Sequence, residues 1–293
     1  MFNNIMLCGT SGYHYLFWGP CPQYEECGIS NFYSFKLSKT EWLKEYSKTL
    51  KSVEINCTRY KKLTPKMCKN WVKSVPKDFK FTIKASLYIT HSKKLKDFKE
   101  WWEEFEKCIL EFGSQFECVL FQFHTSFAKN DKNISKLKNV KKIIPKNIKC
   151  AFEFRNADWY SSKAIKSKRL NKLFKDNWTQ AIIDVPPGDG LGTLSEGVNI
   201  GITNSKFVYI RCHGTTKYCS GTYSRDKLQM LKDIGNEIVE EDGTFVAYFN
   251  NTDTWTLSPF MELEANYGGG NLIPMGTHLT PSAIYNAIMM QNL

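Results

Sequence analysis

The sequence lacks long hydrophobic runs. No apolar stretch approaches the roughly 18 residues that a membrane-spanning helix needs. The N-terminal segment MFNNIMLCGTSG has no basic region followed by a long apolar core, as a signal peptide would. Hydrophobic residues still make up 42% of the 293 residues and charged residues 24%, which excludes an intrinsically disordered chain. We therefore expect a globular protein of the cytoplasm with no membrane partner.

Paired cysteine motifs are also missing. The chain has ten cysteines, but no CxxC pair and no Cys/His cluster at the spacing of a zinc site. Five of them, Cys8, Cys57, Cys118, Cys150 and Cys212, lie in apolar segments, where a reduced thiol behaves as a small hydrophobic group. We predict ten free thiols in a reducing compartment.

Arginine is scarce, although the chain is basic. The net charge is +11, but only 5 of the 40 basic residues are arginine and 35 are lysine. Such a charge is typical of a protein with a polyanionic partner. The excess of lysine, together with 21 asparagines, is equally typical of an AT-rich coding sequence. Composition alone leaves both explanations open.

Eight short apolar runs organise the chain. They cover residues 5–11, 52–58, 80–86, 118–124, 150–156, 180–186, 207–214 and 244–251. Each is rich in Val, Ile, Phe or Cys, as are strands buried on both faces of a parallel sheet. The spacing leaves room for a helix between most neighbouring runs.

Helix signals occupy most of these intervals. Ser38 and Glu41 form a capping box, and Thr64-Pro65 is a typical helix start. Helical patterns follow over residues 97–112, 161–176 and 224–239, whereas 188–205 is predicted as a loop or short 3₁₀ segment. There is neither a GxGxxG motif after the first strand nor a GxxxxGK[ST] motif.

The pattern predicts one (β/α)8 TIM-type barrel over residues 1–293, with a doubly wound open sheet as the alternative. The barrel core is predicted over about 5–255. An irregular C-terminal extension, 256–293, is predicted to end in a short helix that begins after Thr280-Pro281.

Polar residues cluster at the predicted strand ends, where the catalytic residues of such barrels lie. The predicted catalytic groups, which would supply a general acid and a general base, are Glu54, Glu153, Asp184 and His213. The predicted substrate- and anion-binding groups are Tyr13, Asn56, Tyr60, Lys84, His91, Gln122, Arg155, Trp159, Arg211 and Asn250. The structural alternative is that some of these charges only neutralise one another in ion pairs.

The four catalytic candidates also form a conceivable set of metal ligands. Three converging cations, Lys84, Arg155 and Arg211, oppose a divalent ion at the same place. No HExxH or similar motif is present either. We therefore predict no metal and no other cofactor.

Seven motifs occur in a familiar order. They are GTSGYHY (9–15), VEINCTRY (53–60), KASLYITH (84–91), LFQ (120–122), FEFRNADW (152–159), YIRCHGT (209–215) and YFNNT (248–252). Together they resemble the YecE-like family, domain of unknown function 72, over residues 5 to about 255. The resemblance implies a TIM-type barrel, remotely like barrel enzymes of the endonuclease IV and xylose isomerase type, without an established activity.

The chain departs from the family pattern at three motifs. Tyr13 and Asn156 replace the usual Trp and His, and Gln122 is followed by Phe-His rather than by Leu-Pro-Pro. These positions lie at predicted strand ends, so they put the shape of those loops in doubt.

Three functions are compatible with the residues. The first is an enzyme acting on an anionic, phosphate-bearing substrate, nucleic acid included, at the C-terminal face of the barrel. The second is a nucleic-acid-binding protein without catalysis, which would use surface lysines and exposed aromatic side chains. The third is an isomerase or hydrolase acting on a phosphorylated sugar through two carboxylates.

Overall fold

All eight predicted apolar runs form strands of one barrel. The computed structural model describes residues 5–19, 32–34, 36–56, 62–186, 198–257, 261–264 and 279–293. Within these residues the barrel strands are β1 (Ile5–Ser11), β2 (Ser52–Ile55), β3 (Lys80–Lys84), β4 (Phe116–Phe123), β5 (Cys150–Phe154), β6 (Trp178–Gln180), β7 (Ile182–Asp184), β9 (Phe207–Cys212) and β10 (Thr244–Phe249). Every residue of β2, β5, β9 and β10 is buried, as expected for strands covered on both faces.

The sixth barrel strand is split into two halves that pair with different strands, and these two pairings nearly close the barrel. The described strands follow the order β6-β5-β4-β3-β2-β1-β10-β9-β7, and all of these pairings are parallel. β6 pairs with β5, while β7 pairs with β9; only Ala181 separates the two halves. One segment therefore contacts both ends of the sheet. This confirms the TIM-type barrel and excludes the open sheet.

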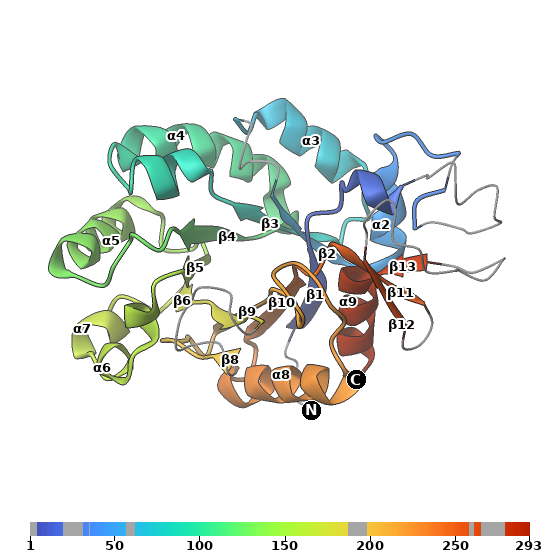
Figure 1. Cartoon of the computed structure of the whole chain (residues 1–293). Helices are drawn as coiled ribbons and strands as arrows, with labels where there is room; N and C mark the ends of the chain where they lie inside the picture. Colours follow the sequence, from blue (N-terminus) through green and yellow to red (C-terminus); the bar gives the residue numbers. More distant parts are fainter. Residues whose placement is uncertain are drawn as a thin grey trace.

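Helices lie around the outside of the strands (Figure 1). In the described residues they are α2 (Trp42–Thr49), α3 (Pro65–Lys73), α4 (Phe98–Ile109), α5 (Asp131–Ile143), α6 (Ser162–Ile165), α7 (Lys168–Asn171), α8 (Arg225–Ile238) and α9 (Ser282–Asn292). Shorter helical turns are η1 (Leu16–Trp18), η3 (Tyr88–Ser92), η4 (Leu110–Gln115) and η5 (Ala157–Tyr160).

The predicted helix starts have a clear physical basis. The Thr64 side chain accepts a hydrogen bond from the Met67 amide at 3.3 Å, and the Ser38 amide donates to the Glu41 carboxylate at 2.9 Å. The Thr64 bond satisfies a backbone N–H in the first turn of α3, whereas the Ser38–Glu41 bond lies in the turn before α2, whose N-cap is Glu41. The helix predicted over 161–176 is instead two short helices, α6 and α7, on either side of Ser167.

The C-terminal extension contains more regular structure than its sequence pattern indicates. The strands β11 (Thr254–Leu257), β12 (Met261–Glu264) and β13 (Leu279–Pro281) form an antiparallel sheet. Helix α9 packs against β1 and β10, and Asn286 on α9 accepts a hydrogen bond from Asn251 at 2.8 Å. The extension thus covers the barrel where its first and last strands meet (Figure 1).

Part of the predicted loop 188–205 lies outside the described residues. Within the described part, β8 (Val198–Asn199) pairs antiparallel with β7.

The described cysteines are free thiols. Six of these seven are buried, and Cys219 is half-buried; Cys21, Cys27 and Cys57 lie outside the described residues. Burial raises the pKa of Cys8 to about 12, so this thiol is protonated at neutral pH and packs as an apolar group. None of the described helices is long and apolar enough to span a membrane.

Candidate functional site

Arg211 is the centre of a buried ion-pair cluster at the C-terminal end of the barrel strands. It lies on β9 and is 1% exposed. Its Nε and Nη2 donate to the two carboxylate oxygens of Glu54 on β2, at 2.9 and 2.6 Å. Its Nη1 donates to Glu153 on β5. The guanidinium is planar and carries five N–H donors, so one arginine links carboxylates from two distant strands.

The Glu54 carboxylate accepts as many hydrogen bonds as it has lone-pair positions. Besides Arg211, Ser11 Oγ donates to one carboxylate oxygen at 2.8 Å and the Tyr209 hydroxyl donates to the other at 2.6 Å. A carboxylate offers about four lone-pair positions, and these four donors fill them.

Glu153 is also held as a carboxylate. Its oxygens accept hydrogen bonds from Gln122 at 2.8 Å and from Arg211, and Arg155 Nε lies 2.5 Å away. Burial alone would raise the pKa of Glu153, but the charges of Arg155 and Arg211 outweigh that effect and hold the pKa well below its usual range. Glu153 is therefore ionised at neutral pH.

His213 is a neutral imidazole in this cluster. It is fully buried, and its Nε2 lies 3.1 Å from Arg155 Nη2 and 3.3 Å from Glu153 Oε1. Burial and the charge of Arg155 lower the pKa of His213 to about 3, against the opposing charge of Glu153. The ring of Tyr218 stacks on the imidazole, with the ring centroids 5.1 Å apart.

A cavity of about 580 Å³ lies directly above this cluster, and we call it the mouth cavity. Its lining includes six of the predicted binding residues: Tyr13, Asn56, Lys84, Gln122, Arg211 and Asn250. Glu54 and Glu153 are fully buried beneath its floor. The predicted site thus has two layers, with the carboxylates below and the cations and amides facing the cavity.

Lys84 is a basic group of the mouth cavity whose charge changes near neutral pH. It is the last residue of β3 and only 5% exposed. Burial, reinforced by the charge of Arg211, lowers the pKa of Lys84 to about 7 from its ordinary value of 10.5. The charges of Glu54 and Glu153 oppose this shift but are outweighed.

Two predicted site residues lie away from the mouth cavity. The Asp184 carboxylate accepts a hydrogen bond from the Tyr223 hydroxyl at 2.8 Å and lies 2.9 Å from Lys227 Nζ on α8, so it faces the outer helices. Trp159 is fully buried and stacks on Phe154, with the ring centroids 3.9 Å apart. Neither is among the described residues that line the cavity.

Two further predicted binding residues are also not placed in the site. His91 lies in η3, where its Nδ1 is 2.9 Å from Thr90 Oγ1 and its ring is 5.6 Å from that of His124. It is not among the described lining residues. Tyr60, and Arg59 beside it, lie outside the described residues.

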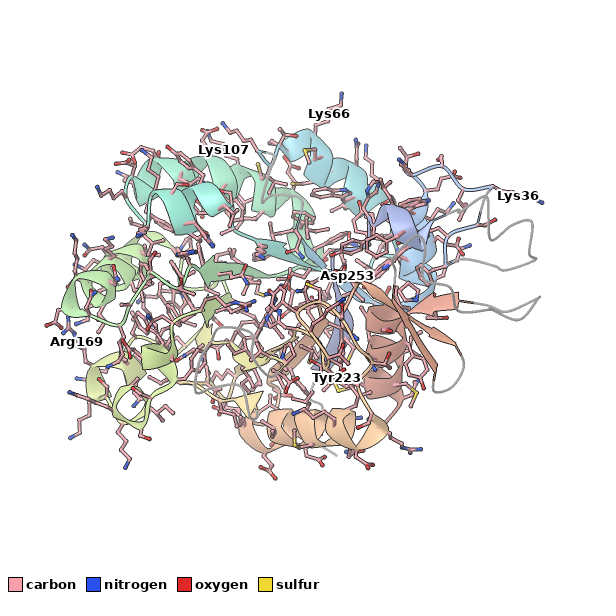
Figure 2. The ribbon with its side chains drawn as sticks, viewed as in Figure 1. Lys36, Lys66, Lys107, Arg169, Tyr223 and Asp253 are labelled. Atoms are coloured by element: carbon pink, nitrogen blue, oxygen red, sulfur yellow. The ribbon has the colours of Figure 1, made fainter. Side chains whose placement is uncertain are left out.

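The structure also brings residues to the cavity that the motifs did not indicate as site residues. Trp71 reaches it from α3, and Tyr218 and Asp253 reach it from the segments after β9 and β10. Asp253, labelled in Figure 2, lines the cavity, and partial burial of its carboxyl group raises the pKa. None of these three residues belongs to one of the seven motifs, so only the folded chain reveals them.

The four residues considered as metal ligands do not converge. Asp184 lies apart from Glu54 and Glu153, which are occupied by arginines. Across the described residues, no three His, Cys, Asp or Glu side chains gather as metal ligands would.

Comparison with known proteins identifies the family. The family model described as "Protein of unknown function DUF72" matches residues 7–261. The chain belongs to the DUF72 family. The UPF0759 protein YunF of Bacillus subtilis is 26% identical over 193 residues, which cover 64% of this chain and 67% of that protein.

Solved DUF72 structures share the fold. A DUF72 protein from Thermotoga maritima superposes with a TM-score of 0.67 at 22% identity, covering 99% of this chain and 98% of that one. A DUF72 protein from Enterococcus faecalis gives a TM-score of 0.66 at 18% identity, covering 100% and 98%. The family resemblance and the barrel fold are therefore confirmed, whereas DUF72 membership specifies no reaction.

Proposed function

We propose that this DUF72 protein is an enzyme that acts on a small phosphate-bearing molecule in the mouth cavity. The observation that carries the proposal is the position of Lys84, a buried amine on the floor of a cavity at the C-terminal end of the barrel. That end holds the active site in enzymes of this fold.

The charges of the cluster favour an anionic ligand. Three basic side chains, Lys84, Arg155 and Arg211, are grouped with two carboxylates in the part of the cluster that the structure describes. Glu54 accepts hydrogen bonds from Arg211, Ser11 and Tyr209, and Glu153 accepts them from Gln122 and Arg211. A negative group that enters the cavity beside Lys84 pairs with the protonated form of the lysine and raises its pKa again.

The size and lining of the cavity favour a small molecule over a nucleic-acid duplex. A volume of about 580 Å³ lies within the range of about 300–1,000 Å³ that small-molecule sites occupy. The rings of Tyr13, Trp71 and Tyr218 form apolar walls. Asn56 Oδ1 is buried and has no hydrogen-bond partner among the described residues, so it is ready to accept one from a ligand hydroxyl. A phosphorylated sugar or a nucleotide matches these features.

Lys84 is also the group best suited to move a proton. A pKa of about 7 lets the side chain exist as ammonium and as amine near neutral pH, which is what general acid–base catalysis needs. As ammonium it stabilises charge on a phosphate oxygen and donates a proton to a departing one. Glu153 then keeps Arg155 and Arg211 in position.

A ligand screen by thermal unfolding tests this function. Sugar phosphates, nucleotides and their unphosphorylated counterparts are compared on the wild type, on Lys84→Met and on Lys80→Met, which changes the opposite end of β3. At a concentration of 100 Kd, a phosphorylated ligand is expected to raise the Tm of the wild type and of Lys80→Met by about 4–5 °C. Hits are then tested for turnover.

Two comparisons test whether the rise in Tm depends on the phosphate group and on Lys84. The unphosphorylated compound and Lys84→Met should each abolish most of the rise in Tm. A rise that is equal in Lys84→Met would show that the anion binds elsewhere, and no rise with any phosphorylated compound would refute the proposal.

A further inference from the structure

Two neighbouring segments of the protein are strongly basic. Helix α5 and the segment 162–176, which contains α6 and α7, together hold 11 Lys or Arg residues and only two acidic residues, Asp131 and Asp176. Their net charge of +9 is most of the +11 of the chain, although they are only about a tenth of its length. The remaining 29 basic and 27 acidic residues nearly cancel in sum, although residues 59–80 form a second basic stretch with eight basic residues and only Asp78 as an acidic one.

The basic residues of these two segments are brought together on one side of the barrel, because α5 and the segment 162–176 line the same groove. Such a grouping of like charge is typical of a surface that binds a polyanion. In Figure 2, Arg169 projects from that edge of the molecule.

The two segments form the walls of a groove of about 550 Å³, which we call the basic groove. It is lined by Lys138, Lys141, Lys142, Lys168, Arg169, Lys172 and Leu173. The floor is fixed by Lys141, whose Nζ donates to the carbonyl oxygens of Leu173 and Lys175 at 2.6 and 3.2 Å. The groove is therefore part of the packed fold.

Four lysines of the basic groove carry charge that the described surroundings do not balance. The two acidic residues of these segments are already occupied: Asp131 pairs with Arg169, and Asp176 lies 3.9 Å from Lys141 Nζ. Among described residues, no carboxylate forms an ion pair with the remaining lining lysines, which are the exposed residues Lys138, Lys142, Lys168 and Lys172. Neighbouring like charges repel one another, and a bound polyanion relieves that repulsion.

We propose that the basic groove binds the phosphate backbone of a nucleic-acid strand, as a function separate from the chemistry of the mouth cavity. A concave channel between two helical segments follows a chain of phosphates better than it follows a flat membrane. The described lining contains no aromatic side chain, so bases are not stacked or read there. Binding is accordingly independent of sequence and strongly dependent on salt.

Fluorescence anisotropy of a labelled 20-nucleotide single strand, as DNA and as RNA, tests this inference over a range of salt concentrations. The test variant replaces the four groove lysines: Lys138→Gln, Lys142→Gln, Lys168→Gln and Lys172→Gln. The matched control replaces four exposed lysines elsewhere: Lys44→Gln, Lys66→Gln, Lys77→Gln and Lys206→Gln. Both variants lose four positive charges, so they differ only in where the charge is removed.

The groove variant is expected to bind at least tenfold more weakly than the control at low salt. The slope of log K against log salt should fall by about 3, since each lysine contact contributes about 0.7 to the slope for a single strand. Equal weakening in both variants would mean that net charge, not the groove, causes binding. Absence of wild-type binding at 25 mM salt, or binding only to anionic vesicles, would overturn the proposal.

Discussion

Replacing Lys84 by Met should stabilise the protein at neutral and acidic pH. Met keeps most of the length of the aliphatic stem and removes the buried charge. Burial lowers the pKa of Lys84 to about 7 in the folded chain, from the ordinary value of 10.5. The unfolded chain therefore binds the proton more tightly, and a folded state with charged Lys84 is penalised.

The size of the effect follows from the pKa shift. At 1.36 kcal/mol for each pKa unit, burial of protonated Lys84 lowers the free energy of unfolding by about 5 kcal/mol below pH 7. We call this loss of stability the penalty. Between pH 7 and 10.5 the folded state is already neutral at Lys84 while the unfolded state is still charged, so the penalty decreases as the pH rises. The stability advantage of Lys84→Met over wild type should thus fall by about 2 kcal/mol between pH 7 and pH 9.

Urea unfolding followed by tryptophan fluorescence at pH 6, 7, 8 and 9 measures this difference. Buffers free of phosphate and sulfate are required, because a bound anion would raise the pKa of Lys84. Lys80→Met, on the same strand, is the control and should show the pH dependence of the wild type. If Lys84→Met and wild type have parallel pH dependences, Lys84 does not titrate near neutrality and the electrostatic reasoning fails.

Two further substitutions separate the structural from the binding residues. Glu54→Gln should destabilise the fold by about 3–5 kcal/mol in urea unfolding, because the buried Arg211 then loses one of its two counter-charges and keeps only Glu153; a loss below about 1 kcal/mol would contradict the ion-pair cluster. Asp184→Asn should cost about 1–2 kcal/mol through its bonds to Tyr223 and Lys227. It should leave anion affinity within about twofold of wild type, and a tenfold loss would place Asp184 in the site.

The barrel could be predicted from the sequence because buried parallel strands have a distinctive composition. Each apolar run is short, rich in β-branched or aromatic residues and separated from the next by a helix-sized interval. The split at Ala181 could not be predicted in the same way. It depends on two different neighbours, β5 and β9, which one continuous segment must contact at once.

Part of the site could also be predicted from the sequence, because charged residues stand out inside apolar strands. Glu54, Glu153 and Arg211 are charges inside apolar strands, and their burial requires them to meet. Asp184 has the same appearance in the sequence, but it faces α8 instead of the interior. In a strand buried on both faces, alternation does not reveal which face is inside, so the motif cannot distinguish the two directions. The cavity residues Tyr218 and Asp253 depend on loop paths that no local pattern specifies.

The most direct test is the affinity of sulfate for the mouth cavity as a function of pH, measured by titration calorimetry. Sulfate keeps its charge over pH 6–9, so any change of affinity reports the protein. The fraction of molecules with a protonated Lys84, which can bind sulfate, falls from about half at pH 7 to about one hundredth at pH 9. This fall predicts about 50-fold weaker binding. Lys84→Met should bind weakly at every pH, and Lys80→Met should follow the wild type. A Kd that is independent of pH, or that is the same in Lys84→Met, would contradict the role assigned to Lys84.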